Sequence, residues 1–288
     1  MISWNIENIS NNYFTLHSFA QKFSAKLIFL SEPMIYKCDL SPILQTFSGS
    51  YEAYLNSEDI HDPDLPLTHP KAKGGTMVFW HKSLSPFLKV LPTCSPSFVS
   101  VLLSPPGILP SLHTAVYLPT AGKDGDWLAT IMDLENHVAE NVERYGDVAV
   151  FLRGDFNASS KNKFRAAILG AVTDRLNLHR VTIWHPTYHH FTGGGASDSD
   201  LDLLLYGGGL DVHESLVDVK CKFKEPLMFS HHDLLVSVCS IPPRKSEEID
   251  TSKNITAPRI PNDRFSTKWS DEGVSEYSDM LSSLLPQI

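Results

Sequence analysis

Five short patches, spread from one end of the chain to the other, place an acid, amide or imidazole where a strand is expected to end. They are Ser3-Trp4-Asn5-Ile6-Glu7, Leu30-Ser31-Glu32-Pro33, Gly154-Asp155-Phe156-Asn157-Ala158, Asp200-Leu201-Asp202-Leu203-Leu204 and Ser230-His231-His232-Asp233. Carboxylate and amide oxygens suit a hard cation such as Mg²⁺, which keeps several waters and completes its shell with substrate phosphate. The patches therefore predict a site for one divalent cation and one phosphate.

The third patch follows an apolar strand expected at Asp147–Leu152. Gly154 lets the backbone turn, so that Asp155 and Asn157 leave the strand end toward one cleft. For this patch alone, an Asx turn that closes the strand is an equally good interpretation.

The first two patches have the same character. Glu32 follows the apolar strand expected at Lys26–Leu30, and Asn5 and Glu7 alternate out of the first strand on one face. Taken singly, Glu32 would be a solvated residue at a strand end, and Asn5 and Glu7 would be a polar pair at the edge of a sheet.

Apolar runs and periodicities predict the elements that position these patches. Strands are expected at Met1–Ile6, Lys26–Leu30, Thr76–Trp80, Phe98–Leu103, Thr114–Tyr117, Asp147–Leu152, Leu201–Tyr206 and Leu234–Cys239. Helices are expected at Asn12–Phe23, Asp126–Tyr145 and Lys163–Val172. Strands that alternate with helices early and dominate late predict an α/β (α+β) fold of two packed β-sheets flanked by helices.

The composition changes after Ile241. Pro242-Pro243-Arg244-Lys245 opens a polar, proline-interrupted stretch, and segments of this kind bury too little apolar surface to order themselves. We therefore predict one domain over 1–241, then a polar linker and a short helix, about Ser270–Leu285, within 242–288.

Bulk properties are those of an ordinary soluble globular protein, with 42% hydrophobic and 20% charged residues among 288. The formal charge of −9 argues mildly against a nonspecific nucleic-acid coat, although a local basic face and a bound metal can dominate at a site. Four widely separated cysteines fit no zinc spacing and are predicted to be free thiols in a reducing compartment. No apolar run approaches the roughly 20 residues of a membrane span, and the first residues do not form a signal peptide.

In this order and with these neighbours, the patches resemble the endonuclease/exonuclease/phosphatase superfamily, the fold of exonuclease III and deoxyribonuclease I. The resemblance covers nearly all of residues 1–240. It implies two packed mixed sheets in a sandwich flanked by helices. It also implies hydrolysis of a phosphodiester that depends on Mg²⁺, or on Mn²⁺ in its place.

The resemblance also implies roles for the first three patches. Asp155 would orient or deprotonate the attacking water, and Asn157 would steady the transition state. Glu32 would bind the metal, with Asn5 and Glu7 at the same metal site.

Two further residues gain a role only from the resemblance. Tyr117, otherwise a core aromatic at a strand end, would donate a hydrogen bond to the phosphate, which favours the nucleic-acid branch of the superfamily. Asp202, otherwise a strand cap, would be the aspartate that supports the catalytic group. We prefer Asp202 to Asp200 and Asp198, which are interpreted as solvated loop acids.

The last patch departs from the superfamily, which shows Ser-Asp-His at this point. His232 takes the catalytic position, and His231 replaces an aspartate that would orient it, which leaves Asp202 or Asp233 as possible orienters. The register of the last strand stays open. A catalytic His231 would turn Leu234, Val236 and Val238 toward the core, whereas a catalytic His232 would turn Leu235, Ser237 and Cys239 toward it.

Two segments resemble the endonucleases of LINE-type (non-LTR) retrotransposons. Lys73-Gly74-Gly75-Thr76-Met77-Val78-Phe79 is similar to their Gly-Gly-led strand, and Lys268–Tyr277 is similar to the connector that precedes a reverse transcriptase. The glycine-rich segment Thr192–Asp200 would be a hairpin that enters a DNA groove, or simply a flexible turn. The prediction is an intracellular, nuclear endonuclease that nicks DNA, has no membrane partner, and belongs to a polyprotein with a reverse transcriptase domain.

Two alternatives remain. One is a phosphodiesterase or phosphatase of the same fold that acts on RNA tails, lipids or inositol phosphates. The other is a catalytically decayed nucleic-acid-binding module, which the His231 replacement and the net acidity keep open.

Overall fold

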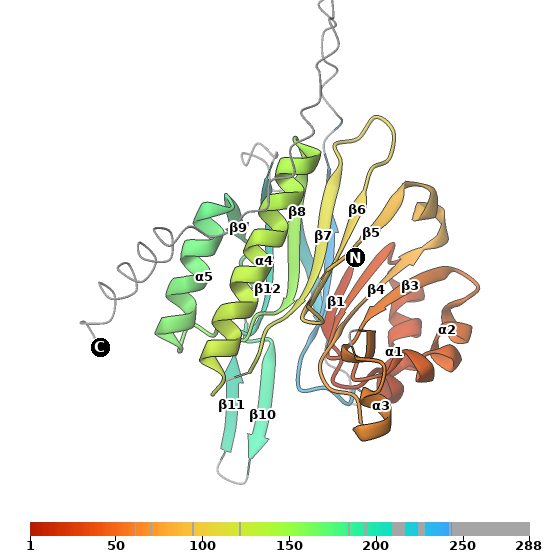
Figure 1. Cartoon of the computed structure of the whole chain (residues 1–288), viewed down its shortest axis with the longest axis vertical. Helices are drawn as coiled ribbons and strands as arrows, with labels where there is room; N and C mark the ends of the chain where they lie inside the picture. The colour runs from red at the N-terminus through yellow and green to blue at the C-terminus, as the bar shows by residue number, and fades with distance from the viewer. Residues whose placement is uncertain are drawn as a thin grey trace, which may run out of the picture. The chain divides into compact units, whose positions relative to one another are not determined.

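The computed structural model describes residues 1–60, 62–69, 71–93, 95–120, 122–183, 185–192, 195–208, 217–223, 228–241 and 243. Within this part of the chain, two six-stranded sheets and one two-stranded hairpin are formed (Figure 1). The linker and the helix predicted near Ser270–Leu285 lie outside the described residues.

The first sheet has the strand order β13-β14-β1-β2-β4-β3. Its strands are β1 (Ile2–Asn5), β2 (Leu27–Ser31), β3 (Tyr51–Asn56), β4 (Thr76–His81), β13 (Val217–Phe223) and β14 (Leu234–Cys239). Strands β1 and β2 are parallel, and Asn5 is the register partner of Ser31. Parallel neighbours end at the same edge of a sheet, so the first two polar patches emerge together.

The second sheet has the order β5-β6-β7-β8-β12-β9. Its strands are β5 (Leu88–Leu91), β6 (Phe98–Leu103), β7 (Ser111–Tyr117), β8 (Ala149–Asp155), β9 (Leu178–Arg180) and β12 (Asp202–Gly208). The parallel pair β7–β8 places Tyr117 opposite Asp155, and the antiparallel pair β8–β12 places Asp202 opposite Asp155. Three predicted site residues therefore meet at one sheet edge through register alone.

The remaining elements connect and cover the sheets. The α-helices are α1 (Ile9–Lys22), α2 (Ser41–Phe47), α3 (Leu65–Thr68), α4 (Asp124–Tyr145) and α5 (Lys163–Arg175), and the 3₁₀ helices are η1 (Lys37–Asp39), η2 (Glu58–Ile60) and η3 (Lys82–Phe87). The hairpin consists of β10 (Tyr188–Thr192) and β11 (Gly195–Ser199), and it projects beyond the second sheet (Figure 1).

Apolar side chains bind these elements into four layers. One cluster joins the first sheet to α1 and α2, for example through Trp4, Leu16 and Phe47. Another joins the second sheet to α4 and α5. A third lies between the sheets and includes Phe29 from β2 and Val101 from β6. Both sheets are thus covered on two faces, as expected where strands read as continuous apolar runs.

Gly154 on β8 lies against the backbone of β7 and the side chain of Ser31 from the other sheet. Its φ is +135°, and a Cβ added there would lie 2.0 Å from the carbonyl oxygen of Val116 and 2.8 Å from Ser31 Oγ. Ser31 Oγ itself donates to the Val116 carbonyl at 2.8 Å, which links β2 to β7 across the interface. The backbone at residue 154 therefore has no room for a side chain.

Gly154→Ala is expected to destabilise the domain by about 2 kcal/mol or more, because it combines a strained φ with overpacking. Chemical denaturation monitored by circular dichroism measures this change. The matched control is Gly170→Ala in α5, where an added Cβ meets nothing within 4 Å. That substitution should raise stability by about 0.5–1 kcal/mol. Equal effects at the two glycines would contradict the packing described here.

Most predicted elements are present with shifted ends. Strands β6 and β14 have the predicted bounds, α1 begins three residues before the predicted Asn12, and β8 continues to Asp155 instead of ending at Leu152. The predicted hairpin segment Thr192–Asp200 forms the end of β10 together with β11. Strands β3, β5, β9 and β13 were not predicted. All four are outer strands of their sheets, and outer strands are less buried and so have a weaker apolar pattern.

Two bulk predictions can be compared with the described residues. Cys38 and Cys239 are free. Cys94 and the side chain of Cys221 are outside the described part of the chain. Among the described residues, no helix combines the length and the apolar character needed to cross a membrane.

Candidate active site

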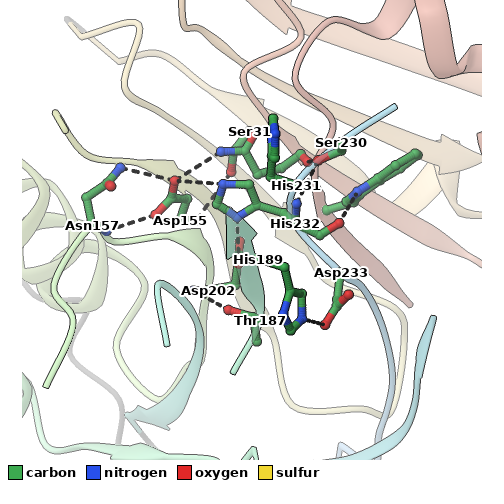
Figure 2. Close-up of polar contacts among 12 residues, drawn as sticks. Ser31, Asp155, Asn157, Thr187, His189, Asp202, Ser230, His231, His232 and Asp233 are labelled. Carbon is green, nitrogen blue, oxygen red and sulfur yellow. Dashed lines mark hydrogen bonds and ion pairs between the residues drawn. The ribbon is translucent and has the colours of Figure 1, made fainter. Parts of the chain in front are cut away.

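The polar patches converge where the strands β1, β2, β7 and β8 end and β12 begins. Figure 2 shows the side chains of Asp155, Asn157, Asp202 and His232 gathered at this edge. Asp155, Asp202 and His232 are each at most 3% exposed. Buried ionisable groups at this density must be paired or hydrogen-bonded, and their contacts define the site.

Asn5 lies at the centre of the acidic groups. Its Nδ2 donates to Glu32 Oε2 at 3.1 Å and to Asp155 Oδ2 at 3.0 Å. Its Oδ1 accepts the backbone N–H of Glu7 at 3.3 Å. The carboxylates of Glu32 and Asp155 therefore point toward one another, held by one fully buried amide.

Asn157 holds Asp155 from the other side. Its backbone N–H donates to Asp155 Oδ1 at 2.9 Å, and its Nδ2 donates to Asp155 Oδ2 at 3.0 Å and to the Leu118 carbonyl at 2.9 Å. Both amide protons are engaged within the protein. In this arrangement Asn157 orients Asp155, and a direct contact with phosphate would require one of these bonds to be exchanged.

His232 pairs with Asp202. Its Nδ1 is 2.8 Å from Asp202 Oδ2, and its Nε2 is 3.9 Å from Asp155 Oδ2. A carboxylate that accepts from Nδ1 fixes the ring orientation and leaves Nε2 to act in the cleft.

The neighbours of His232 in sequence explain two of the motifs. Ser230 Oγ donates to the Asn5 carbonyl at 2.7 Å and accepts the His232 backbone N–H at 3.0 Å. Trp4 Nε1 donates to the His232 carbonyl at 3.2 Å. The Trp-Asn pair of β1 and the serine of the last patch thus position the imidazole.

The environment moves the pKa values of His232 and Asp155. Burial alone would lower the pKa of His232, but the charge of Asp202, its hydrogen bond, and the charge of Asp155 raise it to about 9. Burial raises the pKa of Asp155 to about 7, with Asp202 adding to the effect and His232 opposing it. Asp155 can therefore accept a proton near neutral pH, whereas His232 keeps its proton there and can donate it.

These pKa values predict a bell-shaped dependence of kcat/KM on pH. Asp155 accepts a proton only when ionised, so activity should rise as pH increases through about 7. His232 donates only when protonated, so activity should fall above about 9. Asp202→Asn removes the charge that raises the pKa of His232, while burial still lowers it. The alkaline limb should then move to lower pH, and an unchanged alkaline limb would exclude His232 as the donor.

Tyr117 faces the same acids. Burial, the charge of Glu32 and a hydrogen bond to Glu32 raise its pKa, so the phenol remains protonated and can donate. The ring packs on Gly74, where an added Cβ would lie 3.2 Å from Tyr117 Cε1. The carbonyls of Gly74 and Gly75 accept the backbone N–H groups of Met34 and Glu32, which explains the Gly-Gly motif as a support for this wall.

Three predicted site residues have strained backbones. Glu7, Glu32 and Asn157 have φ values of 43°, 49° and 48°, in the left-handed region that side chains other than glycine rarely adopt. Strain of this kind costs about 1–3 kcal/mol per residue and concentrates at functional sites. Its coincidence with the polar patches is independent support for this edge as the site.

The carboxylate of Glu7 is engaged by His231. Its Oε2 accepts the His231 backbone N–H at 2.6 Å and lies 3.0 Å from His231 Nδ1. The His231 side chain is half exposed and contacts Glu7. Of the two residues expected to orient His232, Asp202 occupies its Nδ1. Asp233, the other possible orienter, contacts His189 instead.

The donor set is suited to a cation with few protein ligands. In the part of the chain that the structure describes, no three His, Cys, Asp or Glu side chains are arranged to hold one metal ion together. Tetrahedral zinc needs such a group, whereas Mg²⁺ is commonly bound by one or two carboxylates and retains its waters. Glu32 fits Mg²⁺ as a carboxylate ligand, and Glu7 would join only by leaving His231. Asn5 turns its Nδ2 toward Glu32 and its Oδ1 toward the Glu7 backbone, so it would ligate the cation only with its amide turned over.

Arg165 supports the site but was not identified from the sequence. This fully buried guanidinium pairs with Asp124 at 2.8 Å and donates to the carbonyls of Pro119, Thr120 and Asn157. It thereby joins the loop after Tyr117 to the loop after Asp155. The signal was available, because Arg165 occupies the first position of the buried helical stripe that continues with Ile168, Leu169 and Val172.

Asp200 is more than a solvated loop acid. It accepts from Ser159 Oγ and the Ser160 backbone N–H, and it pairs with Arg180 at 3.2 Å. These contacts join the end of the hairpin to the loop that follows β8. Asp198 is 51% exposed and contacts His189.

Comparisons with known proteins place this geometry in a known fold. No protein-family model and no curated protein sequence matches the chain. The endonuclease domain of TRAS1, a telomere-specific non-LTR retrotransposon, matches with a TM-score of 0.59 at 14% identity, over 83% of this chain and 96% of that domain. The AP endonuclease LMAP from Leishmania major matches with a TM-score of 0.59 at 13% identity, over 83% and 87%.

A third structure, TDP2 from D. rerio complexed with a single-strand DNA product, matches with a TM-score of 0.55 at 14% identity, over 82% of this chain and 97% of that one. These structures belong to one superfamily. At such identities the likeness establishes the fold. The chain therefore has the deoxyribonuclease I-like fold, as the resemblance of its polar patches predicted.

Proposed function

We propose that this protein is a Mg²⁺-dependent phosphodiesterase, and specifically an endonuclease that nicks one strand of DNA. The observation that carries the proposal is the buried His232–Asp202 pair facing Asp155, which two asparagines hold from opposite sides. A base with a pKa near 7 and a donor with a pKa near 9 are the groups that in-line attack of water on a phosphodiester requires.

Each residue has a role in this proposal. Asp155 orients the attacking water and accepts its proton. His232 Nε2 and the Tyr117 phenol donate to the phosphate oxygens as negative charge develops. Glu32, with Asn5, holds the cation, which when bound neutralises charge on the phosphate.

DNA is the proposed substrate for two reasons. Tyr117 resembles the phosphate-contacting tyrosine of the nucleic-acid branch. Two of the matching structures are endonucleases, and a third contains a DNA product. The resemblance of Lys268–Tyr277 to a retrotransposon connector extends the proposal to a nuclear polyprotein with a reverse transcriptase.

One observation supports a second candidate, a nucleic-acid-binding module without catalysis. Glu7, an expected metal-site acid, is engaged by His231 at 3.0 Å. If this contact prevents cation binding, the fold would keep a cleft that binds substrate but does not cleave it. Cation titration separates the two candidates.

Glu32→Gln tests the metal assignment. We expect the Mg²⁺ concentration for half-maximal cleavage to rise roughly 10- to 100-fold, since even supporting residues of metal sites have effects of this size. Isothermal titration calorimetry with Mg²⁺ should show the same loss of affinity. The control is Glu52→Gln on β3 of the same sheet, whose carboxylate accepts from Trp80 Nε1. Equal Mg²⁺ dependence in wild type and Glu32→Gln would remove Glu32 from the site.

A further inference from the structure

Residues 187–189, the root of the β10–β11 hairpin, contact the segments that carry His232 and Asp202. Tyr188 forms a bridge with His232, the His189 backbone N–H donates to the His231 carbonyl at 2.9 Å, and the Asp233 backbone N–H donates to the Thr187 carbonyl at 2.8 Å. On its other edge β10 pairs with β11. The root of the hairpin is therefore attached to the segment that carries His232.

The same root contacts Asp202. Thr187 Oγ1 accepts the Asp202 backbone N–H at 3.0 Å, and Thr187 is 1% exposed. His232 comes from the end of the first sheet and Asp202 from the start of β12 in the second. Residues 187–189 thus connect both halves of the catalytic pair.

The side chain of His189 links this root to two carboxylates. Its Nδ1 lies 2.8 Å from Asp198 Oδ1. Its Nε2 lies 3.1 Å from Asp233 Oδ2 (Figure 2). Each ring nitrogen can form one hydrogen bond, so the ring of His189 lies between a carboxylate on β11 and the carboxylate next to His232.

The arrangement has a physical reason in Asp233. Its side chain is 1% exposed, and a carboxylate at this depth must be paired or hydrogen-bonded. Asp233 directly follows His232 in the chain, whereas Asp198 lies on β11 and is half exposed. The ring consequently spans from the hairpin to the residue next to the catalytic histidine.

We propose that His189 is a positioning residue, a clamp between Asp198 and Asp233 that holds the β10–β11 hairpin to the segment of His232 and so fixes His232 against Asp155. The proposal rests on the proposed hydrolysis of a phosphodiester at this site. His232 acts only as charge develops on the phosphate, so loss of the clamp should affect the chemical step more than binding.

His189→Gln tests the clamp, because an amide donates through one nitrogen and cannot contact both carboxylates as the two ring nitrogens do. With Mg²⁺ and a labelled DNA duplex, kcat should fall about tenfold to a hundredfold, the scale of a misplaced catalytic group, while KM changes less than threefold. The matched control is His179→Gln, an exposed histidine on β9, which should leave both constants unchanged. Asp198→Asn should have a smaller effect than Asp233→Asn, since only the second partner is buried.

A second measurement does not depend on activity. In protein labelled with ¹⁵N-histidine, the His232 ring signals in the NMR spectrum should shift in His189→Gln but not in His179→Gln. Unchanged His232 signals in His189→Gln, or a kcat of His189→Gln equal to that of wild type, would overturn the clamp, as would a rise in KM at constant kcat. If wild type cleaves no phosphodiester while the NMR result holds, the proposed function fails and the clamp stands as a structural feature.

Discussion

His232→Ala is expected to lose about 10²–10⁴ in kcat, because it removes the donor that faces the developing charge on the phosphate. The imidazole is 3% exposed, its Nδ1 is held by Asp202 at 2.8 Å, and its Nε2 faces Asp155 at 3.9 Å. Steady-state cleavage of a labelled DNA duplex at saturating Mg²⁺ measures the loss. Because the variant leaves Asp202 buried without its partner, thermal melting must accompany the assay.

His231→Ala is the matched comparison. This neighbouring histidine is half exposed and contacts Glu7, so its removal should change kcat by less than about tenfold, well below the loss expected of a catalytic acid or base. His231→Asp would place a carboxylate beside Glu7 and could not orient His232, whose Nδ1 is already occupied. An inactive His231→Ala beside an active His232→Ala would transfer the catalytic role to residue 231.

Asp155→Asn should likewise lose about 10²–10⁴ in kcat, since an amide cannot accept the proton of the attacking water. The fold should be retained, and the dependence of stability on pH supplies a second signature. The raised pKa of Asp155 means that folding disfavours its ionised form, so the wild type loses stability as pH rises from its ordinary value of 3.8 through about 7. Asp155→Asn should abolish this loss. Wild-type cleavage by the variant would contradict the proposed mechanism.

The sequence makes the polar patches recognisable because each is local. An apolar strand followed by a glycine, an acid and an amide is readable from a few residues, and the parallel pairs β1–β2 and β7–β8 then align the patches through backbone register. The fold could be predicted for the same reason, since the elements that carry the patches are the most strongly apolar ones.

The register of the last patch could not be predicted. Leu234 and Val236 pack in the cluster beneath α1, but Leu235 and Ser237 are buried as well. A strand covered on both faces has no apolar period to distinguish one register from the other. The contacts of His232 with Trp4 and Asp202 decide the matter, and those residues are 228 and 30 positions away.

Supporting residues were missed for a related reason. Arg165 and His189 act through partners in distant segments, and a single arginine or histidine in a short element is most often solvated. His231 was expected to matter through its neighbour His232, yet its partner is Glu7, 224 residues away. Contacts of this kind depend on how the sheets are packed, which local patterns do not report.

The most direct test of the account is nicking of supercoiled plasmid by the wild-type protein, with Mg²⁺ and with EDTA, beside Asp155→Asn. The account predicts conversion of supercoiled to open-circular DNA by wild type with Mg²⁺, and none with EDTA or in the variant. Equal nicking by wild type and Asp155→Asn, or no nicking by the wild type with Mg²⁺, would contradict the claim that this cleft hydrolyses DNA.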